Sequence, residues 1–194
     1  TGNVDTEDLD ERRFRQGGKK AFTNKSELLF LALFLDLLEP GGRAAVVVPE
    51  GVLFNSTYAH IALRRRLLFE HELKAVISLP AGVFNPYSGV KTSILFFQKH
   101  RANNDPKFAP GDAPYTKDVL FYEVLDDGFT LDAKRNELFE PGDLPDAIDK
   151  IEKSSTSTDY VRPRIHAERW RLVDKETVEL FPNLVGDLDH DYGI

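Results

Sequence analysis

The sequence predicts an α/β fold in which a mainly parallel sheet carries an antiparallel hairpin. Short apolar runs alternate with helix-length segments, which is the pattern of βαβ units. Two of these runs, residues 75–79 and 93–97, are bounded by Pro and Gly and are expected to be buried central strands. The loop between them is too short for a parallel crossover. The strand over 92–98 is therefore expected to lie antiparallel beside the strand over 73–79.

The first predicted helix covers residues 25–38. Asn24 is expected to be its N-cap, with Glu27 completing a capping-box pair, and residues 40–42 (Pro-Gly-Gly) end it. Apolar side chains occupy nearly every side of this helix, so we expect it to pack between the sheet and a second layer. They are Leu28, Leu29, Leu31, Phe34, Leu35 and Leu38.

A strand and a second helix follow. Residues 43–48 are a continuous run typical of a buried parallel strand, and Pro49 stops it. Residues 50–56 form a loop at the carboxyl end of that strand, where open α/β sheets place ligand crevices. The helix over 57–69 is expected to bury one face and to leave its arginines largely outside. The buried set is Tyr58, Ile61, Ala62 and Leu68, and the arginines are Arg64, Arg65 and Arg66.

The composition of the sequence changes after residue 100. Residues 101–117 have the composition of a surface loop, and Val119 to Leu125 alternates like an edge strand. Asp143 and Pro145 are expected to cap and begin a short helix. The predicted organisation is a polar arm over 1–22, a main body over 23–135 and a mostly helical extension over 136–194. In the extension, we expect Tyr160, Trp170, Val178, Leu180 and Phe181 to dock on the main body.

Composition limits the classes of function. The chain has 194 residues and a net charge of −7, so it lacks the basic surplus of a protein that binds nucleic acid unaided. Its longest apolar run is interrupted by Asp36 and is too short to cross a bilayer, and no signal peptide opens the chain. We therefore expect no membrane partner. The absence of cysteine suits a reducing cytoplasm, and a chain that starts at Thr1 and contains no Met is expected to be a piece of a longer one.

No metal site is predicted. The histidines are scattered without the spacing of a ligand set and are expected to lie at the surface or to form local hydrogen bonds. They are His60, His71, His100, His166 and His190. The aspartates near the C-terminal end lack the Gly and the distal Glu of a calcium loop, so an acidic solvated tail is the preferred interpretation. They are Asp187, Asp189 and Asp191.

Several blocks of the sequence resemble a known family. The blocks are residues 39–54 (EPGGRAAVVVPEGVLF), 79–84 (LPAGVF) and 89–97 (GVKTSILFF), with looser similarity over 119–135. They resemble the modification subunit of type I restriction-modification systems, a family of adenine-N6 DNA methyltransferases. The resemblance implies the C-terminal half of a Rossmann-like class I methyltransferase sheet. It also implies S-adenosylmethionine as methyl donor, DNA as substrate, a specificity subunit and a restriction subunit as partners, and a cytoplasmic location.

Two motifs that the family needs are missing. The glycine pair Gly41 and Gly42 precedes a strand instead of following one, so the cofactor loop is expected to be absent. The Asn/Asp-Pro-Pro-aromatic tetrad, which orients the target amine, is also absent. Asn85-Pro86-Tyr87 has one proline too few and lies in the hairpin loop. No catalytic or cofactor-binding residue is therefore predicted, and the chain alone is expected to be inactive.

The resemblance implies that part of a base pocket remains. Methyltransferases of this kind flip the target adenine out of the duplex and hold it against aromatic faces. Phe84 matches the position of that stacking aromatic, and the alternative is an ordinary core or loop-anchor phenylalanine. Lys91 is a candidate phosphate contact or a solvated loop lysine, while Glu50 and Asn55 either line the pocket or form turns. The competing functional class is a non-catalytic module that docks on the specificity subunit.

Overall fold

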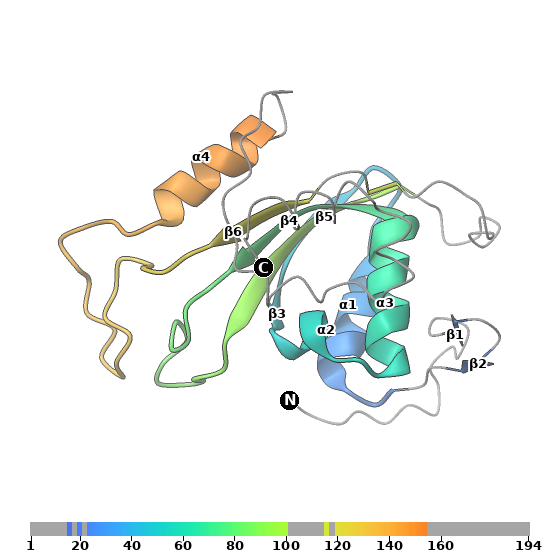
Figure 1. The fold of residues 1–194 in the computed structure, drawn as a ribbon, viewed down its shortest axis with the longest axis horizontal. Coiled ribbons are helices and arrows are strands. Elements are labelled where there is room, and N and C mark those ends of the chain that lie inside the picture. The colour runs from blue at the N-terminus through green and yellow to red at the C-terminus, as the bar shows by residue number, and fades with distance from the viewer. Residues whose placement is uncertain (1–14, 17–18, 21–22, 101–114, 117–118, 155–194) are drawn as a thin grey trace, which may run out of the picture.

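The computed structural model describes residues 15–16, 19–20, 23–100, 115–116 and 119–154 (Figure 1). Of the predicted polar arm, only two short strands are described, β1 (Arg15–Gln16) and β2 (Lys19–Lys20), which pair antiparallel. Most of the arm, most of the predicted loop over 101–117 and residues 155–194 lie outside the described residues. The aromatic set expected to dock on the main body and the C-terminal aspartates therefore lie outside them as well.

The centre of the molecule is a four-stranded sheet in the order β3-β5-β4-β6. Its strands are β3 (Arg43–Pro49), β4 (His71–Ser78), β5 (Thr92–Lys99) and β6 (Leu120–Glu123). β5 runs antiparallel to both of its neighbours, and β6 runs parallel to β4. The prediction of an antiparallel strand beside β4 is confirmed, and β5 is in fact inserted between β3 and β4. The fold class is α/β, as predicted.

The prediction that residues 43–48 form a buried parallel strand is wrong in two respects. β3 lies at the edge of the described sheet, and its only neighbour there, β5, is antiparallel. Val46 and Val48 are buried, but Val47 between them is 49% exposed. An apolar run cannot distinguish a strand buried on both faces from an edge strand with one uncovered face, and this explains the error.

Helices cover both faces of the sheet. α1 (Ser26–Leu37) and α3 (Tyr58–Phe69) lie on one face, and α4 (Leu144–Ser154) lies on the other (Figure 1). Alternation along the strands divides the core accordingly: Leu95 and Phe97 pack toward α1 and α3, whereas Ile94 and Phe96 pack on the cluster that contains Ala147 of α4. No helix in the described ranges is long and apolar enough to cross a bilayer.

α1 begins differently from the prediction. Lys25, not Asn24, is its N-cap residue, and no side chain caps it; the Lys25 N–H instead donates to Thr23 Oγ1 at 3.1 Å. The capping-box prediction is therefore wrong. The predicted end of the helix is confirmed, since Gly41 adopts a φ of +85° that favours glycine.

A buried lysine holds the C-terminal end of α1 to the sheet. Lys99, at the end of β5, is 1% exposed, and its Nζ donates to Leu35 O at 2.5 Å and to Asp36 O at 3.3 Å. Burial is the main cause that lowers the pKa of Lys99, and the nearby Arg66 lowers it further, while Asp36 opposes the shift. Arg66 of α3 also pairs with Asp36 at 2.6 Å, so α1, α3 and β5 are joined at this corner.

α3 buries only part of the predicted face: Ala62 and Leu68 are buried as expected. Tyr58 is 47% exposed, whereas His60 and Arg64 are buried. His60 Nδ1 lies 2.6 Å from Thr57 Oγ1, which confirms a local hydrogen bond for this histidine. Burial first, and then the charges of Lys25 and Arg64, lower its pKa to about 4, against a weaker raising effect of Glu27.

The predicted helix near residue 143 is confirmed as α4. Asp143 does more than precede it, because its Oδ2 accepts hydrogen bonds from the backbone N–H groups of Leu125 and Asp126 at 2.8 and 3.0 Å. Tyr122 of β6 donates to Asp146 Oδ2 at 2.6 Å, and burial together with this bond raises the pKa of the tyrosine. The proposed boundary between residues 135 and 136 falls in the connection between β6 and α4, and the division into domains stays a prediction.

Candidate functional site

The ends of the strands define one edge of the sheet, which we call the carboxyl edge. Pro49, the last residue of β3, pairs with Thr92, the first of β5, and Ser78 at the end of β4 pairs with both Ser93 and Glu123. The carboxyl ends of β3, β4 and β6 therefore meet there. Ligands of open α/β sheets bind outside such ends.

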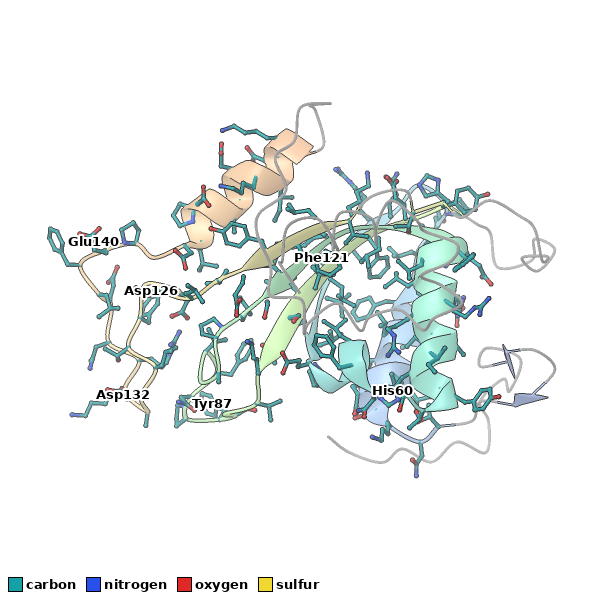
Figure 2. All side chains as sticks on the ribbon, in the orientation of Figure 1. His60, Tyr87, Phe121, Asp126, Asp132 and Glu140 are labelled. Carbon is teal, nitrogen blue, oxygen red and sulfur yellow. The ribbon has the colours of Figure 1, made fainter. Side chains whose placement is uncertain are left out.

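The connection between β4 and β5, residues 80–91, extends beyond this edge; we call it the 80–91 loop. Turn hydrogen bonds give it a defined shape: Asn85 N–H donates to Gly82 O at 2.9 Å, and the N–H groups of Tyr87 and Ser88 both donate to Phe84 O, at 2.9 and 3.0 Å. Phe84 is 41% exposed and Tyr87 is 94% exposed. Tyr87 lies at the outer end of the loop (Figure 2). The loop thus presents aromatic side chains on a fixed backbone.

The structure brings Lys91 and Glu50 together. Glu50 N–H donates to Lys91 O at 3.0 Å, which joins the start of β5 to the residue after β3. The Lys91 ammonium lies 3.4 Å from Glu123 Oε1 at the end of β6, and both side chains are largely shielded from solvent. Lys91 is therefore an ion-paired residue of the carboxyl edge and not a freely solvated loop lysine.

Asn55 lies just after α2 (Gly51–Phe54), the short helix that Glu50 begins. Its side chain folds back toward Gly51, because a Cβ added at Gly51 would lie 3.1 Å from Asn55 Nδ2. Arg64 of α3 donates to Asn55 O at 2.9 Å and to Val52 O at 3.0 Å. The prediction that Arg64 lies outside is thus wrong, and its function is to fix α2 beneath the edge. Arg64 lies one helical turn after His60 and on the same face as Leu67. This spacing was a periodic signal that could have predicted its burial.

Thr92 is a further residue of the carboxyl edge that pattern reasoning did not assign. It is 8% exposed, and its Oγ1 has no hydrogen-bond partner within the part of the chain that the structure describes. Buried hydroxyls are nearly always paired with protein, water or a ligand. Thr92 lies between the ends of β3 and β4, since it pairs with Pro49 and its carbonyl accepts the Leu79 N–H at 2.9 Å.

A hairpin after β6, residues 128–138, lies next to the 80–91 loop. Its ladder includes the bond from Thr130 N–H to Asn136 O and the bond from Leu138 N–H to Gly128 O, both 2.8 Å. Arg135 forms an ion pair with the buried Asp127 and donates to Thr130 O at 3.1 Å. At the outer end, the backbone N–H of Lys134 is the main cause that holds the pKa of Asp132 below its ordinary value. The hairpin is therefore internally braced.

The described residues do not fit a bound nucleotide-like cofactor. The Gly41–Gly42 pair turns between α1 and β3 and is used internally: Gly41 N–H donates to Lys99 O, and Gly42 N–H donates to Glu39 O. A Cβ at Gly42 would lie 2.9 Å from Glu39 O, so the space beside this glycine is filled by the chain itself. No group of three potential metal ligands occurs within the described ranges either.

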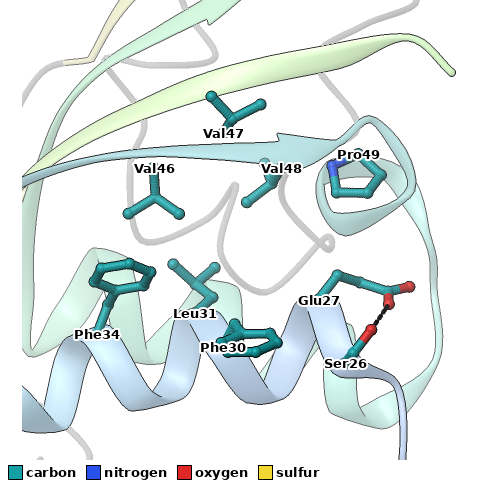
Figure 3. Close-up of a pocket in the computed structure, with 9 residues that line it drawn as sticks. All are labelled: Ser26, Glu27, Phe30, Leu31, Phe34, Val46, Val47, Val48 and Pro49. Atoms are coloured by element: carbon teal, nitrogen blue, oxygen red, sulfur yellow. Dashed lines mark hydrogen bonds between the residues drawn. The ribbon is translucent and has the colours of Figure 1, made fainter. Parts of the chain in front are cut away.

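A groove lies between α1 and β3 and reaches the carboxyl edge at Pro49 (Figure 3). Phe30 and Phe34 of α1 and Val47 of β3 are exposed along it. It contains none of the four predicted site residues. Its lining residues are Ser26, Glu27, Phe30, Leu31, Phe34, Val46, Val47, Val48 and Pro49.

Known proteins are similar to this chain in sequence and in fold. The methylase subunit of the type I restriction enzyme EcoEI from Escherichia coli is 41% identical over 101 residues, which are 52% of this chain and 18% of that protein. A structure determined for complex assembly and conformational transition of a type I R-M system is 32% identical, with a TM-score of 0.55 over 73% of this chain and 26% of that one. A type I restriction-modification methyltransferase subunit from Streptococcus thermophilus is 25% identical, with a TM-score of 0.52 over 77% and 28%.

These relatives are several times longer than the present chain, which spans about a fifth of the curated one. The family model described as N-6 DNA Methylase matches residues 3–166, which include the whole sheet, α1 to α4 and both connections at the carboxyl edge. The chain belongs to the N-6 DNA methylase family.

Proposed function

We propose that this chain forms the target-base side of a site-specific DNA adenine-N6 methyltransferase of a type I restriction-modification system. The observation that carries the proposal is the 80–91 loop, which presents the partly exposed Phe84 at the carboxyl edge of the sheet. Membership in the N-6 DNA methylase family supplies the reaction class.

The chemistry of the reaction requires such a residue. The exocyclic amine of adenine is inaccessible inside a duplex, so the nucleotide must be extruded, and an aromatic face then compensates for the lost base stacking. Base–aromatic stacking contributes about 1–3 kcal/mol per base. With 41% of its surface exposed, Phe84 can offer a ring face to a flipped adenine, which a core phenylalanine could not.

We assign supporting roles to Lys91, Glu50 and Asn55. Lys91 is proposed to contact a DNA phosphate: its ion pair with Glu123 holds the ammonium at the carboxyl edge, and a phosphate can take the place of the carboxylate as its anionic partner. Glu50 and Asn55 are proposed to line the wall beside it. The Thr92 hydroxyl is buried and has no hydrogen-bond partner among the described residues, which supports a polar ligand at this position.

The described residues supply neither the methyl donor site nor the amine-orienting tetrad. We propose that S-adenosylmethionine binds elsewhere in the complete enzyme. We also propose that a specificity subunit reads the DNA sequence, that a restriction subunit joins the full complex and that the assembly works in the cytoplasm. The net charge of −7 agrees with partner-assisted DNA binding.

The test is methyl transfer from labelled S-adenosylmethionine to DNA by the full-length subunit assembled with its specificity partner. Phe84→Ala should lower the rate by about tenfold or more, because it removes the stacking face, whereas Phe84→Trp should retain most of the activity. Phe139→Ala is a matched control, since this phenylalanine is fully exposed and lies outside the 80–91 loop. An unchanged rate for Phe84→Ala with assembly intact would refute the base-side assignment and favour a non-catalytic assembly module.

A further inference from the structure

One side chain joins the two projecting connections of the carboxyl edge. Asn85 Nδ2 donates to the backbone carbonyl of Leu131 at 2.8 Å, across 46 residues of sequence. Tyr87 in the 80–91 loop and Asp132 in the 128–138 hairpin lie at the same end of the molecule (Figure 2). Asn85 is the residue that immediately follows Phe84.

The backbone is shaped to allow this contact. Gly82 is buried and adopts a φ of +90°, a conformation that other residues rarely accept. A Cβ at this position would lie 2.9 Å from Asn85 Nδ2 and 3.0 Å from Leu131 O, the two atoms that form the bond. The close approach of the loop to the hairpin therefore requires glycine at residue 82.

The acceptor belongs to a rigid support. Leu131 lies inside the hairpin that the Thr130–Asn136 bond closes and that Arg135 ties to Asp127. Asp127 is 6% exposed and follows directly on the residues that Asp143 binds, Leu125 and Asp126. The Leu131 carbonyl is thus fixed relative to β6 and α4. The 80–91 loop is held to the sheet at its two ends and by Val83, which packs on the core cluster that contains Ala75 and Ile77, whereas Phe84 and the residues after it project beyond that contact.

We infer that Asn85 is a positioning residue of the target-base pocket: its amide holds the 80–91 loop on the 128–138 hairpin and thereby fixes the ring of Phe84. The inference rests on the proposed function, because it assigns a partner to the loop that carries the stacking residue. A loop that samples several positions presents the ring to the flipped base for only part of the time. The flipped state then loses population, which lowers kcat, whereas contacts with the rest of the duplex, and so KM for DNA, change little.

Two variants separate the hydrogen bond from packing. Asn85→Ala removes the whole amide, and Asn85→Asp keeps its size but replaces the Nδ2 donor by an acceptor that repels Leu131 O. Both should lower kcat by about tenfold, the effect expected from losing one hydrogen bond. A purely space-filling role would leave Asn85→Asp close to wild type. Asn24→Ala is the matched control, because Asn24 is exposed and does not cap α1.

Base flipping is measured with the full-length subunit in its complex on DNA that carries 2-aminopurine in place of the target adenine. Because 2-aminopurine lacks the N6 amine, kcat and KM are measured separately on the same DNA with its natural adenine. The fluorescence of 2-aminopurine reports base flipping directly. A variant that is only less stable, but still assembled in the complex, would not change this signal. We expect both Asn85 variants to change the flipped-base signal and kcat together, with KM for DNA within about twofold of wild type. Normal base flipping and a normal kcat in Asn85→Asp would overturn the inference. A lower kcat together with a lower melting temperature and an unchanged 2-aminopurine signal would also overturn it.

Phe84→Ala, measured in parallel, separates the proposed base-side function of the chain from the proposed positioning role of Asn85. If Phe84→Ala lowers kcat and the Asn85 variants do not, the positioning role is refuted and the base-side assignment stands. If Phe84→Ala leaves both kcat and the signal unchanged, the base-side assignment fails and the role of Asn85 fails with it.

Discussion

Two regions of this molecule expose large apolar side chains, and they do so in different ways. On α1, exposed Phe30, Leu33, Phe34 and Leu37 recur at helical spacing, and Leu28, Leu31, Ala32 and Leu35 form a second, buried stripe on the same helix. In the 80–91 loop, Phe84 and Tyr87 are exposed on irregular backbone that turn hydrogen bonds and the bond to Leu131 hold in place.

The difference indicates what each surface is built for. A helix with two apolar stripes is suited to a position between two layers, and only one of these layers lies within the described residues. Exposure on a loop at the carboxyl edge of a sheet is typical of ligand contact, since loops carry binding residues on a rigid scaffold. Changes at the loop should therefore alter catalysis, whereas changes at α1 and its neighbours should alter stability and association.

The largest expected effect is at Gly82. Gly82→Ala places a methyl group against Asn85 Nδ2 and Leu131 O and adds a strained φ, which costs roughly 1–2 kcal/mol. The loop should shift away from the hairpin, and methyl transfer by the assembled enzyme should fall about ten- to a hundredfold. Steady-state methylation measures this. Gly89→Ala, in the same loop, is the control, because the φ of Gly89 is not in the left-handed region and an added Cβ would meet no heavy atom closer than 4.0 Å. Equal losses in the two variants would contradict the comparison.

The next effect is a pH dependence on the α1 side. His60 has its pKa lowered to about 4, against an ordinary value of about 6.5, because it is buried. Between these values the unfolded chain binds the proton and the folded chain does not. Stability is therefore complete above about pH 6.5 and should fall by up to about 3 kcal/mol as the pH drops to 4.

Urea denaturation at a series of pH values checks this dependence. His60→Gln should flatten the curve between pH 4 and 6.5, because glutamine does not titrate. Asn24→Gln, a substitution at an exposed residue that adds and removes no titrating group, is the control and should leave the slope unchanged. An equally steep slope in His60→Gln would show that another group controls the stability in this range.

A smaller loss is expected at Lys99. Lys99→Met removes the ammonium that donates hydrogen bonds to Leu35 O and Asp36 O at the end of α1. These carbonyls then lack that donor. Loss of the bonds should cost about 1–2 kcal/mol, because the relief from burying a charge offsets part of the penalty. Hydrogen exchange of the α1 amides should accelerate. Unchanged kcat in the folded enzyme would confirm that this corner acts on stability alone.

How well the sequence predicted each strand and helix depended on the kind of sequence pattern that was available. Short apolar runs bounded by Pro and Gly located β4 and β5, and the length of the connection between them fixed their antiparallel relation. The same kind of run misplaced β3, because local sequence does not show which faces of a strand are covered. The burial of Lys99 was not predicted because its acceptors, Leu35 O and Asp36 O, lie 64 and 63 residues away in the sequence, which no local pattern displays. Arg64 was missed although its spacing from His60 and Leu67 carried a periodic signal.

The candidate site shows the same limit. Phe84, Lys91 and Glu50 were selected from the resemblance and from strand ends, and the structure does bring Lys91 and Glu50 together. Asn85 was considered only as part of a motif that it does not complete. Its bond to Leu131 joins residues that are 46 positions apart, so only the three-dimensional arrangement reveals it.

The smallest change in folding free energy is expected on the uncovered face of α1, and it gives the clearest contrast with the loop. Replacing Phe30 and Phe34 together by Gln exchanges exposed apolar surface for polar surface and should alter the folding free energy of this chain by less than about 0.5 kcal/mol per site. It should, however, reduce concentration-dependent association of the 194-residue chain. The apolar stripe lies beside the edge of β3 that pairs with no other described strand, and such an edge favours self-contact. Light scattering over a concentration series measures this, with Phe139→Gln as the control at a fully exposed phenylalanine outside the stripe. Equal reductions in both variants would mean that exposed apolar area, wherever it lies, causes the association, and the distinction between the two regions would then lose its physical basis.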